Sequence, residues 1–264
     1  MKSGKLKMIA ILLLCAVLLS GCDLRNYFYT EDGLKRVAEK SLKKKYGEDF
    51  VVYRAWDRSQ ELFFADCSPK DNPDVVFQAD IYKNGSGIYA DGYSQAVISK
   101  EVDDILGGSF REVFGNCYTV GEVLYYYKQP KFENPKEVTI EEYLEQSDIG
   151  FMIYYVFVEK TDVSEKDVEK EYQFLSEELV QNVSDNIRQE EVKNLIVVLY
   201  FVDEQMLKEC QNFFSTNANV KGEFSPKLSE YWDNEVNCNY KSGNIDKSYE
   251  EYKKVRLQLE TEDK

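Results

Sequence analysis

The sequence contains no histidine, the side chain that most often serves as a general acid or base. Serine–histidine and cysteine–histidine hydrolase sites are therefore excluded within one chain, as are histidine-ligated zinc sites. Any catalysis would depend on carboxylates, lysine, tyrosine or cysteine. Paired carboxylates are frequent, but they fall on predicted helix surfaces or in loops, where solvation explains them. These pairs are Asp103-Asp104, Glu141-Glu142, Glu177-Glu178 and Glu190-Glu191.

Three short strings could form a serine–lysine site: Ser41-Leu42-Lys43-Lys44, Ser184-Asp185-Asn186 and Lys241-Ser242-Gly243. In order and type they are similar to the three boxes of the penicillin-recognising enzymes, which would make Ser41 the nucleophile and Lys44 its activator. The context argues against this interpretation. Ser41 lies late in a lysine-rich helix instead of opening one, and the third string lies in a loop-like context.

The sequence supports neither a dinucleotide-binding site nor a calcium site. Gly85-Ser86-Gly87-Ile88-Tyr89-Ala90 matches a dinucleotide fingerprint, but it lies in a predicted hairpin and not between a strand and a helix. A calcium loop needs a spaced run of aspartates with a glycine, and the sequence has none. We therefore expect neither a cofactor nor a metal site.

The clearest chemical signal is Cys22, which ends the string Leu19-Ser20-Gly21-Cys22. It follows a lysine-rich start and an apolar run from Met8 to Leu19, which is shorter than the ~20 residues that cross a bilayer. The string matches the lipobox L-[AS]-[GA]-C, and residues 1–22 resemble the signal peptide of a bacterial lipoprotein. The resemblance implies that the Cys22 thiol takes a diacylglyceryl group and that residues 1–21 are then removed.

Two acyl chains on Cys22 would hold the protein stably at a membrane, because each buried methylene contributes ~0.8 kcal/mol. We expect residues 22–30 to be a short tether at the extracytoplasmic face of the cell membrane. Asp23 follows the lipidated position, and in a cell with two membranes the resemblance implies retention at the inner one. The alternatives are an uncleaved anchor and an ordinary signal peptide with a chance cysteine.

Four more cysteines remain after the leader and Cys22 are set aside: Cys67, Cys117, Cys210 and Cys238. They contain no CxxC pair, so a zinc ribbon or a thioredoxin-like motif is not supported. Outside the membrane, disulfides are possible, and proximity in sequence favours Cys67–Cys117 and Cys210–Cys238. The alternative is four buried free thiols.

The composition indicates a folded and strongly acidic protein. The formal net charge is −15, and loss of three lysines with the leader would make it −18. Such a charge repels nucleic acid and anionic lipid head groups, so we expect neither nucleic acid binding nor docking of the body on the bilayer. Hydrophobic residues make up 43% of the chain and aromatic residues 14%, which supports folded cores.

The sequence predicts a first α+β lobe over residues 31–129. Thr30 and Gly47 are suited to begin and end a helix, Asn84-Gly85 marks a hairpin turn, and Gly107-Gly108 should end a second helix. The expected elements are a helix at 31–46, an antiparallel meander of strands at 49–58, 61–67 and 75–83, a helix at 94–106 and a strand at 117–128.

A second α+β lobe is predicted over residues 136–264, after the proline-containing segment Gln129 to Pro135. Apolar strands at 150–160 and 193–202 enclose a helix at 164–183, an order that favours a crossover between two buried strands and is compatible with parallel pairing. The remaining expected elements are helices at 139–146, 203–215 and 244–259 and a hairpin-like stretch at 220–240.

These features predict an α+β lipoprotein of two small lobes that acts as a non-catalytic binding or accessory module of the cell envelope. Its partner would be a protein, a peptide or a wall polymer. One alternative is a histidine-independent enzyme that uses carboxylates or lysine on envelope polymers, and another is a structural or inhibitory protein. Buried carboxylates in one cleft would favour the enzyme, whereas an exposed tyrosine-rich groove would favour binding.

Overall fold

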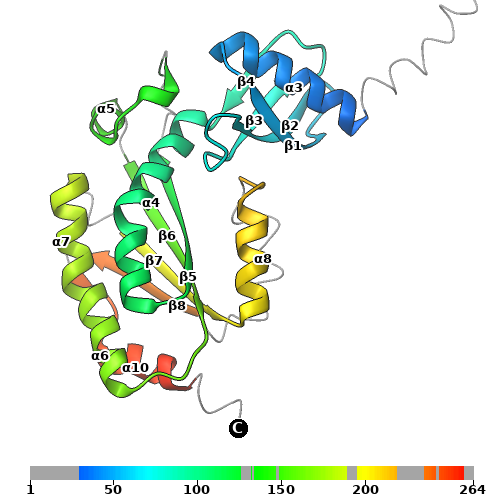
Figure 1. Ribbon diagram of the computed structural model, residues 1–264. Helices are drawn as coiled ribbons and strands as arrows, with labels where there is room; N and C mark the ends of the chain where they lie inside the picture. Colours follow the sequence, from blue (N-terminus) through cyan, green and yellow to red (C-terminus); the bar gives the residue numbers. More distant parts are fainter. Residues whose placement is uncertain are drawn as a thin grey trace, which may run out of the picture. The chain divides into compact units, whose positions relative to one another are not determined.

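A computed structural model describes residues 30–125, 132, 134–146, 149–188, 195–218, 235–241 and 244–258 (Figure 1). The fold is α+β, as predicted, with helices packed on two sheets. The predicted signal peptide and nearly all of the tether, Cys22 included, lie outside these residues. Among the helices of the described ranges, none is both long enough and apolar enough to cross a bilayer.

The contacts divide the chain into two units that are each discontinuous in sequence. Unit 1 contains residues up to 70 together with 79–91, and unit 2 contains residues 71–78 together with those from 92 onward. The boundary predicted near residue 130 lies elsewhere, because it would separate two strands that pair along their length, Cys117–Tyr125 and Ile149–Glu159. Residues 93–125 therefore belong with the second half of the chain.

Unit 1 packs one helix on a four-stranded sheet. Helix α3 (Glu31–Tyr46) begins and ends where predicted, since the Thr30 hydroxyl accepts a hydrogen bond from the Gly33 N–H (3.2 Å) and Gly47 adopts a φ of 76°. Its buried apolar side chains face the sheet, whose strands run in the order β1-β2-β3-β4. The strands are β1 (Phe50–Asp57), β2 (Leu62–Pro69), β3 (Phe77–Tyr82) and β4 (Ile88–Asp91).

The sheet of unit 2 has the strand order β5-β6-β7-β8-β9. Its central strands β6 and β7 are parallel, with Met152 opposite Leu195, which agrees with the predicted crossover. The other pairs are antiparallel. The strands are β5 (Cys117–Tyr125), β6 (Ile149–Glu159), β7 (Leu195–Val202), β8 (Glu235–Lys241) and β9 (Asn244–Ile245).

Helices cover both faces of this second sheet (Figure 1). Helix α4 (Tyr93–Phe114) and the crossover helix pack on one face, and α8 (Glu204–Phe214) packs on the other. The crossover comprises α6 (Glu165–Gln173), a π-helical turn η2 (Phe174–Glu178), α7 (Leu179–Val183) and a second π-helical turn η3 (Ser184–Arg188). Smaller elements complete the unit: η1 (Pro135–Glu137), α5 (Ile140–Gln146) and α10 (Tyr249–Gln258).

Helix α4 corrects the prediction that Gly107-Gly108 ends it. The helix continues to Phe114, because Phe110 and Phe114 extend its buried stripe beyond the glycines. Gly107 faces the sheet, and a Cβ there would lie 2.9 Å from Thr119 Oγ1. This glycine therefore serves close helix–sheet packing and not helix termination.

Near the C-terminal end, the helix predicted at 244–259 begins only at Tyr249, because Asn244–Ile245 pair with β8 as β9. Ser248 starts the helix, and its N–H and hydroxyl both donate to the Glu251 carboxylate. Of the hairpin-like stretch predicted at 220–240, residues 235–240 form most of β8 and the rest lies outside the described ranges.

Candidate functional site

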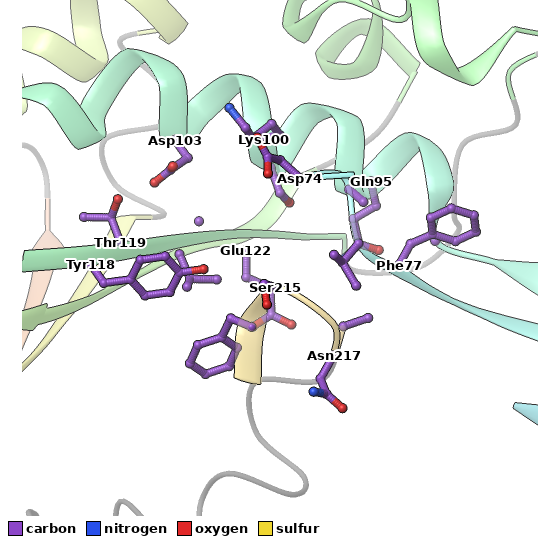
Figure 2. A pocket seen from close by; sticks show the side chains of 18 of the residues that line it. Asp74, Phe77, Gln95, Lys100, Asp103, Tyr118, Thr119, Glu122, Ser215 and Asn217 are labelled. Atoms are coloured by element: carbon purple, nitrogen blue, oxygen red, sulfur yellow. The ribbon is translucent and has the colours of Figure 1, made fainter. Parts of the chain in front are cut away.

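A cavity of about 670 Å³ lies in unit 2 along strand β5 (Figure 2). Helix α4 supplies one wall, the C-terminal end of α8 and the residues after it supply another, and β5 lies between them. This volume is within the range of ~300–1,000 Å³ that is typical of ligand sites. The polar and charged side chains of the lining are Asp74, Gln78, Gln95, Ser99, Lys100, Asp103, Asp104, Arg111, Tyr118, Thr119, Glu122, Gln211, Ser215 and Asn217.

The floor of the cavity is the outer edge of the sheet. Among the described strands, β5 pairs with β6 alone. The Val123 N–H donates to Ser99 Oγ (3.1 Å), so this amide points away from β6. Because backbone groups alternate along a strand, the N–H and C=O groups of Thr119 and Gly121 also point outward, toward the cavity that these residues line. A hydrogen-bonding backbone edge therefore faces the cavity.

On the α4 wall, Asp103 is held in place by a buried tyrosine. The Tyr154 hydroxyl donates to Asp103 Oδ1 (2.6 Å). Burial, followed by the neighbouring Asp103 charge, raises the pKa of Tyr154 far above its ordinary value, so the hydroxyl remains a donor. Lys100 on the same wall is ion-paired with Asp104. Asp103 thus presents a positioned carboxylate to the cavity.

The α8 wall is aromatic at its base and polar at its rim. The Tyr118 ring stacks on Phe214 with centroids 6.3 Å apart, and Phe214 stacks on Phe157 at 5.5 Å. Burial is the largest cause that raises the pKa of Tyr118 to about 12. Glu122 lies on this face, because its partner Ile153 belongs to the core under α8, and Figure 2 shows Asp103 and Glu122 on opposite sides of β5.

The charge of the lining is unbalanced. Four carboxylates, from Asp74, Asp103, Asp104 and Glu122, face two basic side chains, Lys100 and Arg111. The surrounding chain has a formal net charge of −15, which adds to the negative potential. The cavity therefore favours cationic ligands. In the part of the chain that the structure describes, no three histidine, cysteine or acidic side chains are grouped so as to hold a metal ion.

The four cysteines considered for disulfides are all buried free thiols. Cys67 and Cys117 belong to different units. Cys210 lies in the core under α8, whereas Cys238 lies in the core on the opposite face of the same sheet, so the sheet separates them. The predicted pairs are therefore not formed, and short separation in sequence was a misleading guide to proximity.

The residues of the other motifs singled out in the sequence lie in separate elements, as far as the structure describes them. Ser41 is buried against the core of unit 1, whereas Ser184 begins η3, the last turn of the crossover helix of unit 2. Ser242 and Gly243 lie outside the described residues, and the fingerprint-like string from Gly85 forms the hairpin between β3 and β4.

Of the tyrosines considered for a binding groove, Tyr82, Tyr89 and Tyr93 do not line the cavity, and the rings of Tyr82 and Tyr89 pack edge to face in unit 1 (6.1 Å between centroids). Tyr93 is buried and stacks on Phe77, Tyr89 is 60% exposed in unit 1, and Tyr126 and Tyr127 lie outside the described residues. The cavity itself was not predicted, because its walls come from segments that are distant in sequence. The one local signal was Gly121, a glycine inside an apolar strand, which often marks a place where another chain segment approaches closely.

Comparison with known proteins gives a fold and no function. No protein-family model and no curated protein matches the sequence. The fold is similar to the crystal structure of a DUF5037 family protein from Ruminococcus gnavus ATCC 29149, solved at 2.55 Å resolution. The TM-score is 0.66 and the sequence identity 17%, over 85% of this chain and 99% of that one. At this identity the likeness shows a shared α+β fold only.

Proposed function

We propose that this protein is a lipid-anchored accessory protein at the extracytoplasmic face of the cell membrane, and that the cavity of unit 2 binds its ligand without chemical turnover. The anchor part depends on the lipobox ending in Cys22. The binding part depends on one observation, which is the 670 Å³ cavity lined by a strand edge, a positioned carboxylate and aromatic rings. Such a mixture of apolar surface and a few directed polar groups is typical of binding sites.

Binding is favoured over catalysis by the state of the candidate reactive groups. Asp103 Oδ1 already accepts a hydrogen bond from Tyr154, which fixes this side chain as a binding group. The amino group of Lys100 is engaged in an ion pair with Asp104, which disfavours its use as a nucleophile. Cys117 lies close to the cavity on β5, but burial raises its pKa to about 11, which disfavours the reactive thiolate.

The alternative is a carboxylate-dependent enzyme that acts on envelope polymers. The observation in its favour is that Asp103 and Glu122 approach the cavity from opposite sides of β5. If this alternative held, Asp103→Asn would abolish turnover of a cell-wall substrate while the protein stayed folded. In a binding protein, no turnover exists to be lost.

A photo-crosslinking experiment in intact cells tests the proposal. A photoreactive amino acid at Ala96, which lines the cavity, should give a specific adduct, whereas the same residue at the exposed Glu177 on the crossover helix should not. Cys22→Ala should release the protein from the membrane and reduce the adduct. Equal adducts from both positions would reject the cavity as the site. The anchor would be rejected if the parent protein carried no acyl group on Cys22 and the Cys22→Ala variant stayed bound to the membrane.

A further inference from the structure

We infer that the ligand of the cavity is an extended peptide segment that pairs with the outer edge of β5 and carries at least one lysine or arginine. This inference rests on the proposed function and names the partner class of the same site. It depends on three features of the described residues: the direction of the β5 backbone groups, the placement of the walls and the charge of the lining.

The backbone of β5 favours a peptide over a compact small molecule. Thr119 and Gly121 each direct one N–H and one C=O outward, and the intervening Val120 also lines the cavity. A compact ligand would satisfy only part of this alternating row of donors and acceptors. An extended chain satisfies it along its length, as in other cases of peptide addition to a sheet edge.

The walls of the cavity approach β5 from both faces of the sheet. Helix α4 approaches β5 so closely at Gly121 that a Cβ there would lie 3.0 Å from the Ser99 carbonyl oxygen. The small side chains of Ala96 and Ala218 line the remaining walls. Helix α4 packs on one face of the sheet and α8 on the other, and residues of the segment 74–78, together with Gly92, complete the lining. A strand added to β5 would lie between the two helices. Side chains of an added strand would point alternately to the two helices.

Each helix presents a partner for such alternating side chains. Toward α4, the Asp103 carboxylate is positioned by Tyr154 and suits a guanidinium or ammonium group. Toward α8, Glu122 and the Tyr118 ring offer a second negative charge and an aromatic face, and a cation binds favourably to both. Four carboxylates of the lining outnumber its two basic side chains, Lys100 and Arg111, and Lys100 is already paired with Asp104. An acidic peptide would therefore be repelled.

The test uses the lipidated protein in detergent and a positional-scanning library of capped hexapeptides, with arginine, leucine or glutamate fixed at each position in turn. We expect arginine-fixed pools to bind about tenfold more tightly than glutamate-fixed pools at one or more positions, with a difference that shrinks as salt is added. Equal binding of the arginine and glutamate pools, or binding of neither, would overturn the inference. A small cation such as free arginine that competes fully at equal concentration would also overturn it.

The strand-pairing mode has its own test. In the best peptide, N-methylation of the alternate amides that face β5 should weaken binding about tenfold, whereas N-methylation of the other alternate set should leave binding within about twofold. Equal effects of the two sets would rule out pairing with the edge of β5.

Protein variants link the peptide to the cavity. Asp103→Asn keeps an oxygen that accepts from Tyr154 and removes the charge, so it should abolish the preference for arginine, whereas Asp162→Asn, at an exposed position outside the lining, should not. Ala96→Trp should block binding and Ala90→Trp on β4 should not. If the adduct from position 96 forms in cells while every peptide pool fails, the proposed function stands and the peptide inference falls.

Discussion

At the scale of single residues, two adjacent glycines of α4 have opposite environments. A Cβ on Gly107 would lie 2.9 Å from Thr119 Oγ1, 3.1 Å from the Tyr154 hydroxyl and 3.3 Å from Asp103 Oδ1. A Cβ on Gly108 would meet no atom within 4 Å. The first glycine is thus required by packing beneath the cavity, whereas the second only lowers helix stability.

This contrast predicts effects of opposite sign for the same substitution. Gly107→Ala should lower the free energy of unfolding by about 1–3 kcal/mol, because α4 must move away from the sheet. Gly108→Ala should raise it by up to about 1 kcal/mol, because alanine favours the helix. Urea denaturation of the two variants measures both values. Equal changes would show that α4 does not pack on β5 at Gly107.

Tyr118 predicts a dependence of stability on alkaline pH. Its pKa is raised to about 12 in the folded protein, mainly by burial, from an ordinary value near 10. The folded state therefore keeps a proton that the unfolded state loses, so this contribution is complete below about pH 10 and declines as the pH rises to about 12. In the Tyr118→Phe variant, the free energy of unfolding should fall less steeply between about pH 10 and about pH 12. Tyr89→Phe, at a 60% exposed ring, is the matched control and should leave the slope unchanged.

At the scale of elements, a buried ion pair joins α10 to α6. Arg256 donates from Nε to Glu171 Oε2 (3.0 Å) and from a terminal nitrogen to Oε1 (3.2 Å), and the Tyr252 hydroxyl donates to Oε2 (2.7 Å). Arg256 is 1% exposed and Glu171 3% exposed, and the guanidinium lies 4.3 Å from the ring centroid of Phe201. Neither charge can be left alone at such a position without a large desolvation cost.

Arg256→Met should therefore lower the free energy of unfolding by about 3–5 kcal/mol, because it leaves the Glu171 carboxylate buried without its cation. Lys253→Met, which breaks the exposed pair with Glu165 (3.1 Å), should cost no more than about 1 kcal/mol. Chemical denaturation of the two variants measures both changes, and the two substituted residues lie on the same helix, α10. If the double variant Arg256→Met with Glu171→Leu were as unstable as Arg256→Met alone, lost packing of Arg256 would explain the effect instead of the buried charge.

At the scale of the whole molecule, both units keep buried thiols in their cores. Burial raises the pKa of Cys67 well above its ordinary value, and it raises the pKa of Cys238 to about 12. Neutral buried thiols react slowly, because the thiolate is the nucleophile.

Mass spectrometry after iodoacetamide treatment tests this state. The folded protein should be alkylated slowly at Cys67, Cys117, Cys210 and Cys238, and all four should react once the protein is unfolded in the absence of a reducing agent. If Cys22 carries the proposed lipid, it should stay unreactive in both samples. Two thiols that react only after reduction would demonstrate a disulfide and contradict the structure.

Features that short stretches of chain encode could be predicted before the fold was known. The ends of α3 follow from Thr30 and Gly47, the start of α6 from the capping residue Ser164, and the crossover from two apolar strands around an amphipathic helix. The absence of histidine excluded whole classes of active site, and the lipobox ending in Cys22 predicts where the protein resides. Hydrogen bonds at helix ends and hydrophobic periodicity span only a few residues, so they can be recognised without a fold.

Which surfaces meet became clear only from the fold. The pairing of β5 with β6 moved the boundary between the units, the sheet separated Cys210 from Cys238, and the packing of α4 explained Gly107. The cavity arises in the same way, because α4, β5 and α8 are brought together by long-range packing. Helical and strand periodicity fixes which face of an element is apolar but does not specify its partner, so the edge of β5 could not be assigned before the fold was known.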